Sequence, residues 1–550
     1  MLSLKALSAR SSIVRRCTAL SARPSLVRCC ALGTAQLRQQ STANTAILKP
    51  DPSIAFEHRS LGELATLWAV YQACSSPRFV SAAPGIMDAM KDLRLSWLSN
   101  AIIRKTFFAW FCAGETESEI IGCMGRLRDQ GIGSLIGFSA EADLSSSADD
   151  PAMASARSNV KADAFAKEYA NSIRMAAKVP GAIAAVKLTS LVDPAVMFRV
   201  SAALETLKGV FAKAQNPAGD AIRLSEFLDA ATKSIPGKSA DKEVYAALFS
   251  LADQDHDGLV DWVDMQSAFD LGTPAVQAFC INANTECSPL DLQDFLRLIA
   301  RAHGLIRYAA DQKVRVFIDA EHSYFQQAID HVAGTLQREF NGDAGPLVYN
   351  TYQMYRVDTP SRLEADYRRS QREKWRFALK LVRGAYMHLE RTRAKQLGYT
   401  SPIHTTIQDT HTAYDRMVEL ILGQMARAQH AGSLVPALFA ATHNNGSIEN
   451  TLRLIRSSGV DMTGEPVMFG QLLGMQDATS YALAKMGVPV YKYVPYGPLD
   501  EVMPFLVRRA LENSAVSSSI RGEGPLVLAE IRRRLLGGHR EAPSSSATNQ

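Results

Sequence analysis

Eight short runs of nearly continuous apolar residues recur along the chain, and amphipathic stretches separate most of them. The runs cover residues 132–138, 183–188, 314–318, 347–352, 377–382, 435–441, 467–469 and 488–494. Runs of this kind are typical of parallel strands that are covered on both faces. Between them, residues 324–340, 407–425 and 447–457 carry apolar side chains at spacings of three and four, which predicts helices.

Eight strands that alternate with helices predict an α/β fold, a (β/α)8 barrel of the TIM type. The barrel is expected in two parts, 131–190 and 301–536, behind an N-terminal helical region at 46–130. The alternative is a doubly wound open sheet, but the Gly-x-Gly-x-x-Gly loop of a dinucleotide-binding fold is absent from the sequence. We therefore favour the barrel.

Between the second and third predicted strands the chain is too long for a loop, so residues 191–300 are predicted to form an inserted helical domain. Residues 253–264, DQDHDGLVDWVD, match an EF-hand loop with Gly258 at its sharp turn. The predicted ligands of Ca²⁺ or Mg²⁺ are Asp253, Asp255, Asp257, Leu259, Asp261 and Asp264. Asp264 stands where a bidentate Glu is usual, which weakens Ca²⁺ binding and favours Mg²⁺. The alternative is an Asp-rich turn without an ion. Residues 215–226 fit a degenerate, ion-free partner loop.

The net charge of +5 is concentrated at the N-terminus. Residues 1–45 hold seven basic side chains and no acidic one, and the rest of the chain has two more acidic than basic residues. The charge therefore gives no indication of nucleic-acid binding. An Arg- and Ser-rich start without acids predicts a mitochondrial transit peptide, the alternative being a disordered basic tail. Residues 537–550 are predicted to be a disordered tail. No window reaches the ~18–20 unbroken apolar residues that a membrane span needs.

In a barrel, functional side chains are expected at the carboxyl ends of the strands. The polar and aromatic residues there include Lys187, Asp319, Asn350, Tyr352, Lys380, Arg383, Thr442, His443 and Tyr493. After the last strand, Phe505, Arg508 and Arg509 share one face of a predicted helix. Paired guanidinium groups hold a carboxylate through charge-assisted bonds, so a carboxylate clamp is expected at the barrel mouth.

Five sequence blocks resemble the mitochondrial proline dehydrogenase family, of the eukaryotic type with extra sequence after the second strand. They are FIDAEHSYFQQAI (317–329), KLVRGAYMHLERTRAKQLGY (380–399), ATHNNGS (441–447), FGQLLGM (469–475) and YKYVPYGPLDEVMPFLVRRALENS (491–514). The resemblance implies a distorted (β/α)8 barrel that binds FAD at its mouth. It also implies oxidation of L-proline to Δ1-pyrroline-5-carboxylate, with hydride transfer from C5 to flavin N5 and electrons passed to ubiquinone. The implied location is peripheral, on the matrix face of the inner mitochondrial membrane.

The resemblance also implies roles for individual residues. Asp319 and Lys380 are the expected catalytic residues beside the flavin. The expected flavin contacts are Asp319, Asn350, Lys380, Arg383, Gly384, Ala385, Thr442 and His443. The expected substrate contacts are Lys187, Tyr386, Tyr493, Phe505, Arg508 and Arg509, with Glu141 as a gate that pairs with the first arginine of the clamp.

Two other functions are open from the sequence. Hydroxyproline dehydrogenase would use the same fold and cofactor. Phe505 stands where proline-specific members have Tyr and hydroxyproline-specific relatives have a small residue, so its bulk favours proline. The second alternative is a calcium-responsive barrel without enzymatic activity, but the catalytic and clamp residues are all present in the sequence.

Overall fold

The structure is a computed structural model that describes residues 48, 51–75, 82, 85, 96–138, 151–215, 221–235, 241–284, 286–503, 505–506 and 519–536. Several predictions fall outside these residues. They concern the transit peptide at 1–45, the gate Glu141, the clamp residues Arg508 and Arg509, and the tail at 537–550.

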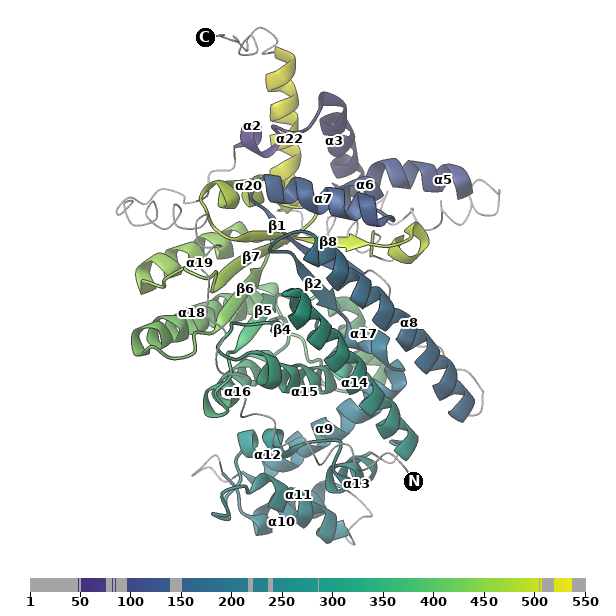
Figure 1. The fold of residues 1–550 in the computed structure, drawn as a ribbon, viewed down its shortest axis with the longest axis vertical. Coiled ribbons are helices and arrows are strands. Elements are labelled where there is room, and N and C mark those ends of the chain that lie inside the picture. The colour runs from purple at the N-terminus through teal and green to yellow at the C-terminus, as the bar shows by residue number, and fades with distance from the viewer. Residues whose placement is uncertain are drawn as a thin grey trace. The chain divides into compact units, whose positions relative to one another are not determined.

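Eight parallel strands close into a barrel in chain order, with β1 paired to β8 (Figure 1). The strands are β1 (Gly133–Phe138), β2 (Ile183–Val186), β3 (Arg315–Ile318), β4 (Val348–Gln353), β5 (Ala378–Val382), β6 (Ala437–Ala441), β7 (Val467–Leu472) and β8 (Val490–Tyr496). Each coincides with one of the predicted apolar runs, so the predicted barrel is confirmed.

Bulky side chains fill the inside of the barrel. The interior cluster contains Leu135, Ile183, Ala185, Phe317, Tyr349, Ala378, Ala437, Phe439, Met468 and Tyr491. Glycines on neighbouring strands make room for the larger rings. A Cβ atom at Gly470 would lie 2.0 Å from Cε1 of Phe439, and one at Gly133 would lie 2.2 Å from Cε1 of Tyr491. The barrel is therefore a packed core rather than a channel.

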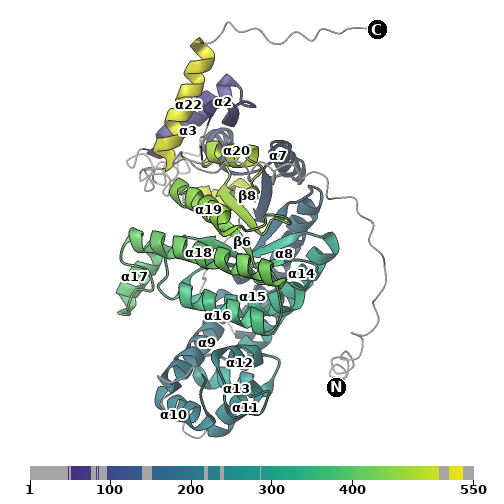
Figure 2. The ribbon, with the colours of Figure 1, turned by 90° about the vertical axis from the view of Figure 1, so that its left-hand side faces the viewer.

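Helices cover the outside of the barrel (Figures 1 and 2). They are α8 (Pro151–Ala177), α14 (Pro289–Gln312), α15 (Ser323–Phe340), α16 (Thr359–Arg372), α17 (Met387–Leu397), α18 (Ile407–Ala431), α19 (Asn445–Ser458) and α20 (Asp477–Lys485). Side-chain caps fix where several of them begin. In α18, for example, Thr406 and Asp409 cap each other's backbone N–H groups. The predicted helices at 324–340, 407–425 and 447–457 are confirmed by α15, α18 and α19.

A second apolar cluster joins the N-terminal helices to the end of the chain. These helices are α2 (Pro52–Ala55), α3 (Leu61–Ser75), α5 (Ser96–Ile103), a π-helical turn (Arg104–Phe108), α6 (Ala109–Phe111) and α7 (Glu117–Asp129). In this cluster, Tyr71 of α3 and Phe111 of α6 pack together with Val527 of α22 (Ser519–Leu536). The Tyr71 hydroxyl donates a hydrogen bond to the buried carboxylate of Glu523 on α22, over 3.0 Å.

The insertion after β2 is helical. It contains α9 (Pro194–Ala214), α10 (Leu224–Ser234), α11 (Lys242–Ala252), α12 (Trp262–Ala268) and α13 (Pro274–Ala283), and a short 3-10 helix (Leu188–Leu191) precedes it. Helix α9 packs against α15, and α12 contacts α16. The predicted domain boundary at residue 300 falls inside α14, a single helix that leads into β3.

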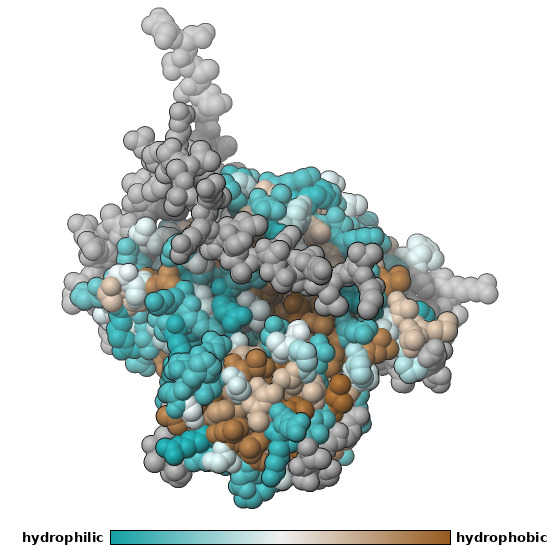
Figure 3. All heavy atoms as spheres, turned by 60° about the horizontal axis from the view of Figure 1, so that its bottom comes forward, coloured by the Kyte–Doolittle hydropathy of each residue, from teal (hydrophilic) through white to brown (hydrophobic). Residues whose placement is uncertain are grey.

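The surface of the insertion is partly apolar. Leu224, Leu251 and Leu259 are each more than a third exposed. Figure 3 turns the lower end of Figure 1 forward, and it shows apolar residues in brown patches among polar ones and around a hollow. Among the described residues, no helix is both long enough and apolar enough to span a bilayer.

Candidate active site

Two predicted catalytic residues meet inside the mouth of the barrel. Lys380 lies on β5 and Asp319 directly follows β3, and the Lys380 ammonium group donates a short hydrogen bond to Asp319 Oδ1. Their side chains are only 8% and 13% exposed. The rings of Phe317 and Tyr493 each have their centre 6.0 Å from Lys380 Nζ. The structure therefore groups a buried ion pair with Tyr493, an aromatic residue that the sequence predicts for the substrate pocket.

Arg383 connects the end of β5 to the end of β6. Its Nη1 donates to Thr442 Oγ1 over 2.5 Å, its Nη2 to Ser447 Oγ over 2.8 Å, and its Nε to His411 Nδ1 over 2.8 Å. The guanidinium group lies 4.4 Å from the ring centre of Tyr414, and burial lowers its pKa.

Ser447 belongs to the first turn of α19, which Asn444 caps. A helix N-terminus beside an arginine and hydroxyl donors has the chemistry of a phosphate-binding site. The structure therefore brings together Arg383 and Thr442, two residues that are predicted to contact the flavin, and His443 follows directly in the chain.

The loop after β5 passes close to an aromatic ring. Gly384 has φ of +132°, and a Cβ atom there would lie 2.3 Å from Cδ1 of Tyr355, so only glycine fits. The amide of Ala385 donates to Gln353 Oε1 over 3.3 Å, and Gln353 Nε2 donates to the carbonyl of Glu321 over 2.7 Å. Gln353 was not singled out from the sequence. Its place at the carboxyl end of β4, where functional side chains are expected, could have revealed it.

The structure corrects the prediction for Asn350. Its side chain is 2% exposed and points away from the barrel interior, where Nδ2 donates to Asp330 Oδ1 over 3.0 Å. Tyr352 lies on the same outer side and donates to Asp366 over 2.7 Å. Alternate residues of a strand face opposite sides, and Tyr349 belongs to the interior cluster. Asn350 therefore binds a helix on the outside of the barrel and does not line the barrel mouth.

Lys187 follows β2 and lies near a buried acid that the sequence did not reveal. Glu321 is 8% exposed and accepts a hydrogen bond from Thr189 Oγ1 over 2.6 Å. Burial raises the pKa of Glu321, while the charge of Lys187 opposes this effect. Glu321 is two residues beyond Asp319, and that proximity was the only signal in the sequence.

Tyr386 packs against His322, with ring centres 4.2 Å apart. His322 Nδ1 lies 3.5 Å from Glu390 Oε1, and Glu390 is fully buried. Burial alone would raise the pKa of Glu390, but hydrogen bonds from His322 and Ser323 lower it overall. The predicted substrate residue Tyr386 thus packs against His322, which contacts a buried acid, and no sequence pattern indicated that His322 has this position.

The two other predicted aromatic residues lie in different clusters. Tyr493 lines the barrel interior, where a Cβ atom at Gly137 would lie 2.3 Å from its hydroxyl oxygen. Phe505 is 9% exposed and packs in the cluster of the N-terminal helices. The substrate contact of Phe505 stays a prediction.

The Asp-rich loop joins α11 to α12. The carboxylates of Asp253, Asp255 and Asp257 lie within 4.8 Å of one another. Asp261 and Asp264 instead bind Arg372 of α16, with 2.7 Å between Arg372 Nη1 and Asp264 Oδ1. Asp264 also accepts from the Asp261 amide over 2.9 Å, as part of the cap of α12. The predicted set of ligands is therefore corrected: the structure gathers three of the five carboxylates and turns two towards Arg372.

A single backbone bridge joins the Asp-rich loop to the segment that the sequence predicts as its partner. The backbones of Ile222 and Val260 exchange two hydrogen bonds of 2.9 Å in an antiparallel bridge. These residues are the eighth positions of the two loops, 215–226 and 253–264. Ile222 of the predicted partner loop therefore lies beside the Asp-rich loop, and in the sequence that partner loop carries no acid at its first, third or fifth position.

Comparisons with known proteins identify the family of this chain. Residues 123–522 match the family model described as proline dehydrogenase. The chain is 30% identical to "Proline dehydrogenase 1, mitochondrial" of Homo sapiens, over 90% of this chain and 92% of that protein. It is 29% identical to the Caenorhabditis elegans protein of the same name, over 90% of this chain and 89% of that protein. It is 31% identical to the hydroxyproline dehydrogenase of Bos taurus, over 89% of this chain and 94% of that protein.

Among solved structures, the fold is similar to proline utilization A from Bdellovibrio bacteriovorus, with a TM-score of 0.53 and 16% identity. The similarity covers 94% of this chain and 44% of that one, so the chain spans less than half of that protein. The family model covers well over half of the present chain, from before β1 to beyond β8. The chain therefore belongs to the proline dehydrogenase family of oxidoreductases.

Proposed function

We propose that this enzyme oxidises L-proline to Δ1-pyrroline-5-carboxylate with FAD as its cofactor. The observation that carries the proposal is the buried Lys380–Asp319 pair, which faces the mouth of a barrel of the proline dehydrogenase family. Arg383 and its donors lie at the same carboxyl ends of the strands.

The donor set fits FAD. Arg383, Thr442, Ser447 and the N-terminus of α19 form a basic, hydroxyl-rich group that suits the pyrophosphate. Bound FAD would supply the hydride acceptor of the reaction. Lys380 would keep a positive charge beside the isoalloxazine ring, and Asp319 would hold that ammonium group in place.

The remaining residues would bind and orient the substrate. Lys187, Arg508 and Arg509 would hold the proline carboxylate, and Tyr386 and Tyr493 would pack around the ring. The substrate nitrogen must be neutral so that its lone pair assists loss of hydride from C5, and one further proton leaves from nitrogen. The protein's contribution is thus orientation and charge placement.

Hydroxyproline is the second candidate substrate, because a hydroxyproline dehydrogenase of Bos taurus is as similar to this chain as the proline dehydrogenases are. An anaerobic titration decides between the two. We expect L-proline to bleach the flavin absorbance of the purified yellow protein at lower concentrations than trans-4-hydroxy-L-proline does. A colourless protein would refute the cofactor, and bleaching by hydroxyproline alone would refute the substrate.

Electrons are proposed to pass to ubiquinone at the matrix face of the inner mitochondrial membrane, with the chain bound peripherally. The mitochondrial relatives support the compartment. Reduction of a soluble ubiquinone analogue in the presence of proline tests the acceptor. Fractionation of mitochondria with carbonate washing tests the peripheral attachment, since a peripheral protein is released.

The Asp-rich loop is proposed to bind Mg²⁺ or Ca²⁺ weakly through Asp253, Asp255 and Asp257. Adding either ion should raise the melting temperature, and Asp253→Ala should abolish the rise. Asp229→Ala is the matched control, because Asp229 is an exposed acid of the same insertion that pairs with Lys233 of its own helix. An unchanged melting temperature in the wild type would contradict ion binding.

A further inference from the structure

Glu115 joins the N-terminal helical region to the segment that follows the last strand of the barrel. Its Oε1 atom accepts a hydrogen bond of 2.7 Å from the amide of Leu499, and its Oε2 atom accepts one of 2.5 Å from Nη1 of Arg104. Leu499 begins a helix, of which residues 499–503 and 505–506 are described, and we call these residues the post-β8 helix. The first amide of this helix is thus bound by a side chain that lies 384 positions earlier in the chain.

The residue that precedes the post-β8 helix cannot cap it. This residue is Pro498, whose side chain has no hydrogen-bond acceptor, whereas Ser, Thr, Asn or Asp is usual at that position. The amides of Glu501 and Val502 bond to the carbonyl of Pro498, over 3.0 and 3.1 Å. The amide of Leu499 is one of the first-turn amides that no carbonyl of the helix can reach, so Glu115 supplies the acceptor. Its carboxylate also suits the positive end of the helix dipole.

The backbone around Glu115 is held on two sides. The amide of Glu115 donates over 3.0 Å to Oε2 of Glu119, the acid of the α7 capping box. On the other side, the amide of Ala113 donates to the carbonyl of Pro495 on β8 over 2.9 Å. Gly114 lies between these two anchors with φ of +140°, and a Cβ atom there would lie 2.5 Å from Cβ of Glu119. Because its backbone is fixed to both α7 and β8, Glu115 can define where the post-β8 helix starts.

The post-β8 helix carries residues that are predicted to bind the substrate. Phe505 lies on it and is buried in the same apolar cluster as Leu499. Arg508 and Arg509 follow in the sequence, outside the described residues. A helix advances by about 1.5 Å per residue with a regular twist, so the place and direction of its start determine where the side chains further along it lie.

We propose that Glu115 is a positioning residue for substrate binding, because it fixes the start of the helix whose residues meet the proline carboxylate. This inference rests on the proposed function, in which Arg508 and Arg509 hold that carboxylate. Glu115 acts through Leu499, and Arg104 fixes the orientation of the Glu115 carboxylate by binding its other oxygen. Loss of Glu115 should therefore weaken the binding of proline and spare the transfer of hydride.

The experiment is anaerobic stopped-flow reduction of the flavin-loaded full-length protein by L-proline, which gives a Kd and a limiting rate of flavin reduction. Glu115→Ala should raise the Kd by roughly five- to tenfold, the factor that corresponds to the loss of one helix cap. The limiting rate should change by less than about twofold, because Lys380 and Asp319 come from β5 and the end of β3. A purely structural role would lower the fraction of protein that holds flavin and leave the Kd of the loaded fraction unchanged.

A second ligand and two further variants sharpen the test. Cyclopentanecarboxylate has a five-membered ring and a carboxylate but no nitrogen, so it cannot be oxidised as proline is, and its inhibition constant should rise by the same factor as the Kd. Glu117→Ala is the matched control, because Glu117 is a neighbouring acid that pairs with Arg174 and Lys178, and it should leave the Kd unchanged. Glu115→Asp has a shorter side chain that cannot span both partners. It should raise the Kd by about threefold and replaces Glu115→Ala if that variant holds no flavin.

Arg509→Met separates this inference from the proposed function. If Arg509→Met raises the Kd of proline and the two Glu115 variants do not, the inference alone is overturned. If L-proline does not reduce the wild-type flavin, or Arg509→Met leaves the Kd unchanged, the proposed role of the clamp fails and the inference fails with it. An equal rise of the Kd in Glu117→Ala would also overturn the inference, since the effect would then not belong to the contact with Leu499.

Discussion

The buried pair at the barrel mouth yields the sharpest prediction, which concerns Asp319→Asn. The substitution keeps the shape of the side chain and removes its charge, so that the Lys380 ammonium group stays buried without its counter-ion. Because the two side chains are only 8% and 13% exposed, the ammonium group cannot be rehydrated without local opening. Removing one partner of a buried pair costs about 3–5 kcal/mol of the free energy of unfolding.

The measurement is urea denaturation of Asp319→Asn, Lys380→Met and the double variant. We expect the double variant to be more stable than the sum of the two single losses predicts, by more than about 1 kcal/mol, because neither charge is then left alone. Asp229→Asn is the matched control. It breaks a pair of 2.6 Å whose side chains are 72% and 62% exposed, and should cost less than about 1 kcal/mol. If Asp319→Asn cost no more than this control, the pair would not be buried as described.

Three further predictions follow from other parts of the chain. Gly470→Ala should lower the free energy of unfolding by about 1–3 kcal/mol, because its Cβ would lie 2.0 Å from the Phe439 ring; Gly304→Ala, with open space around it, is the control. Burial, reinforced by Asp477, raises the pKa of Glu523 to about 7. The folded chain thus binds a proton that the unfolded chain releases, and this contribution to stability is lost as the pH rises from about 4.5 to 7. Urea denaturation between pH 5 and 8 should therefore show that the free energy of unfolding falls less with rising pH for Glu523→Gln than for the wild type. Equal decreases in the two proteins would contradict the raised pKa of Glu523. Phe505→Ala should raise turnover of hydroxyproline relative to proline in steady-state assays, whereas Phe505→Tyr should keep the preference for proline.

The sequence by itself determined the barrel. All eight strands coincide with apolar runs, because strands covered on both faces must be apolar on both, and this leaves a continuous signal along the chain. The ends of these strands then located Asp319, Lys380 and Arg383, since parallel strands in a barrel bring their carboxyl ends to one rim. The Asp-rich loop and its partner were equally visible, because their residues are local in sequence.

Only the tertiary structure decided which way several side chains face. Strand β4 carries polar side chains on both faces, Asn350 on one and Gln353 on the other, so the sequence could not show which face turns inwards. Nor could it show that Arg372 binds the last two acids of the Asp-rich loop, because that contact joins residues more than a hundred positions apart.

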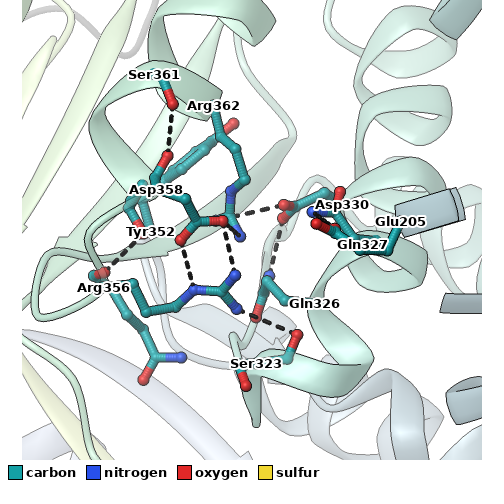
Figure 4. A network of polar contacts seen from close by, with 12 residues as sticks. Glu205, Ser323, Gln326, Gln327, Asp330, Tyr352, Arg356, Asp358, Ser361 and Arg362 are labelled. Atoms are coloured by element: carbon teal, nitrogen blue, oxygen red, sulfur yellow. Dashed lines mark hydrogen bonds and ion pairs between the residues drawn. The ribbon is translucent and has the colours of Figure 1, made fainter. Parts of the chain in front are cut away.

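A cavity beside Arg362, whose surroundings Figure 4 shows, is also a feature that only the tertiary structure decides. It exists because α9 and α12 of the insertion dock against α15 and α16, and its two walls come from segments that are distant in the chain. Local patterns determine where helices and strands form, whereas the meeting of their surfaces depends on how the whole chain packs.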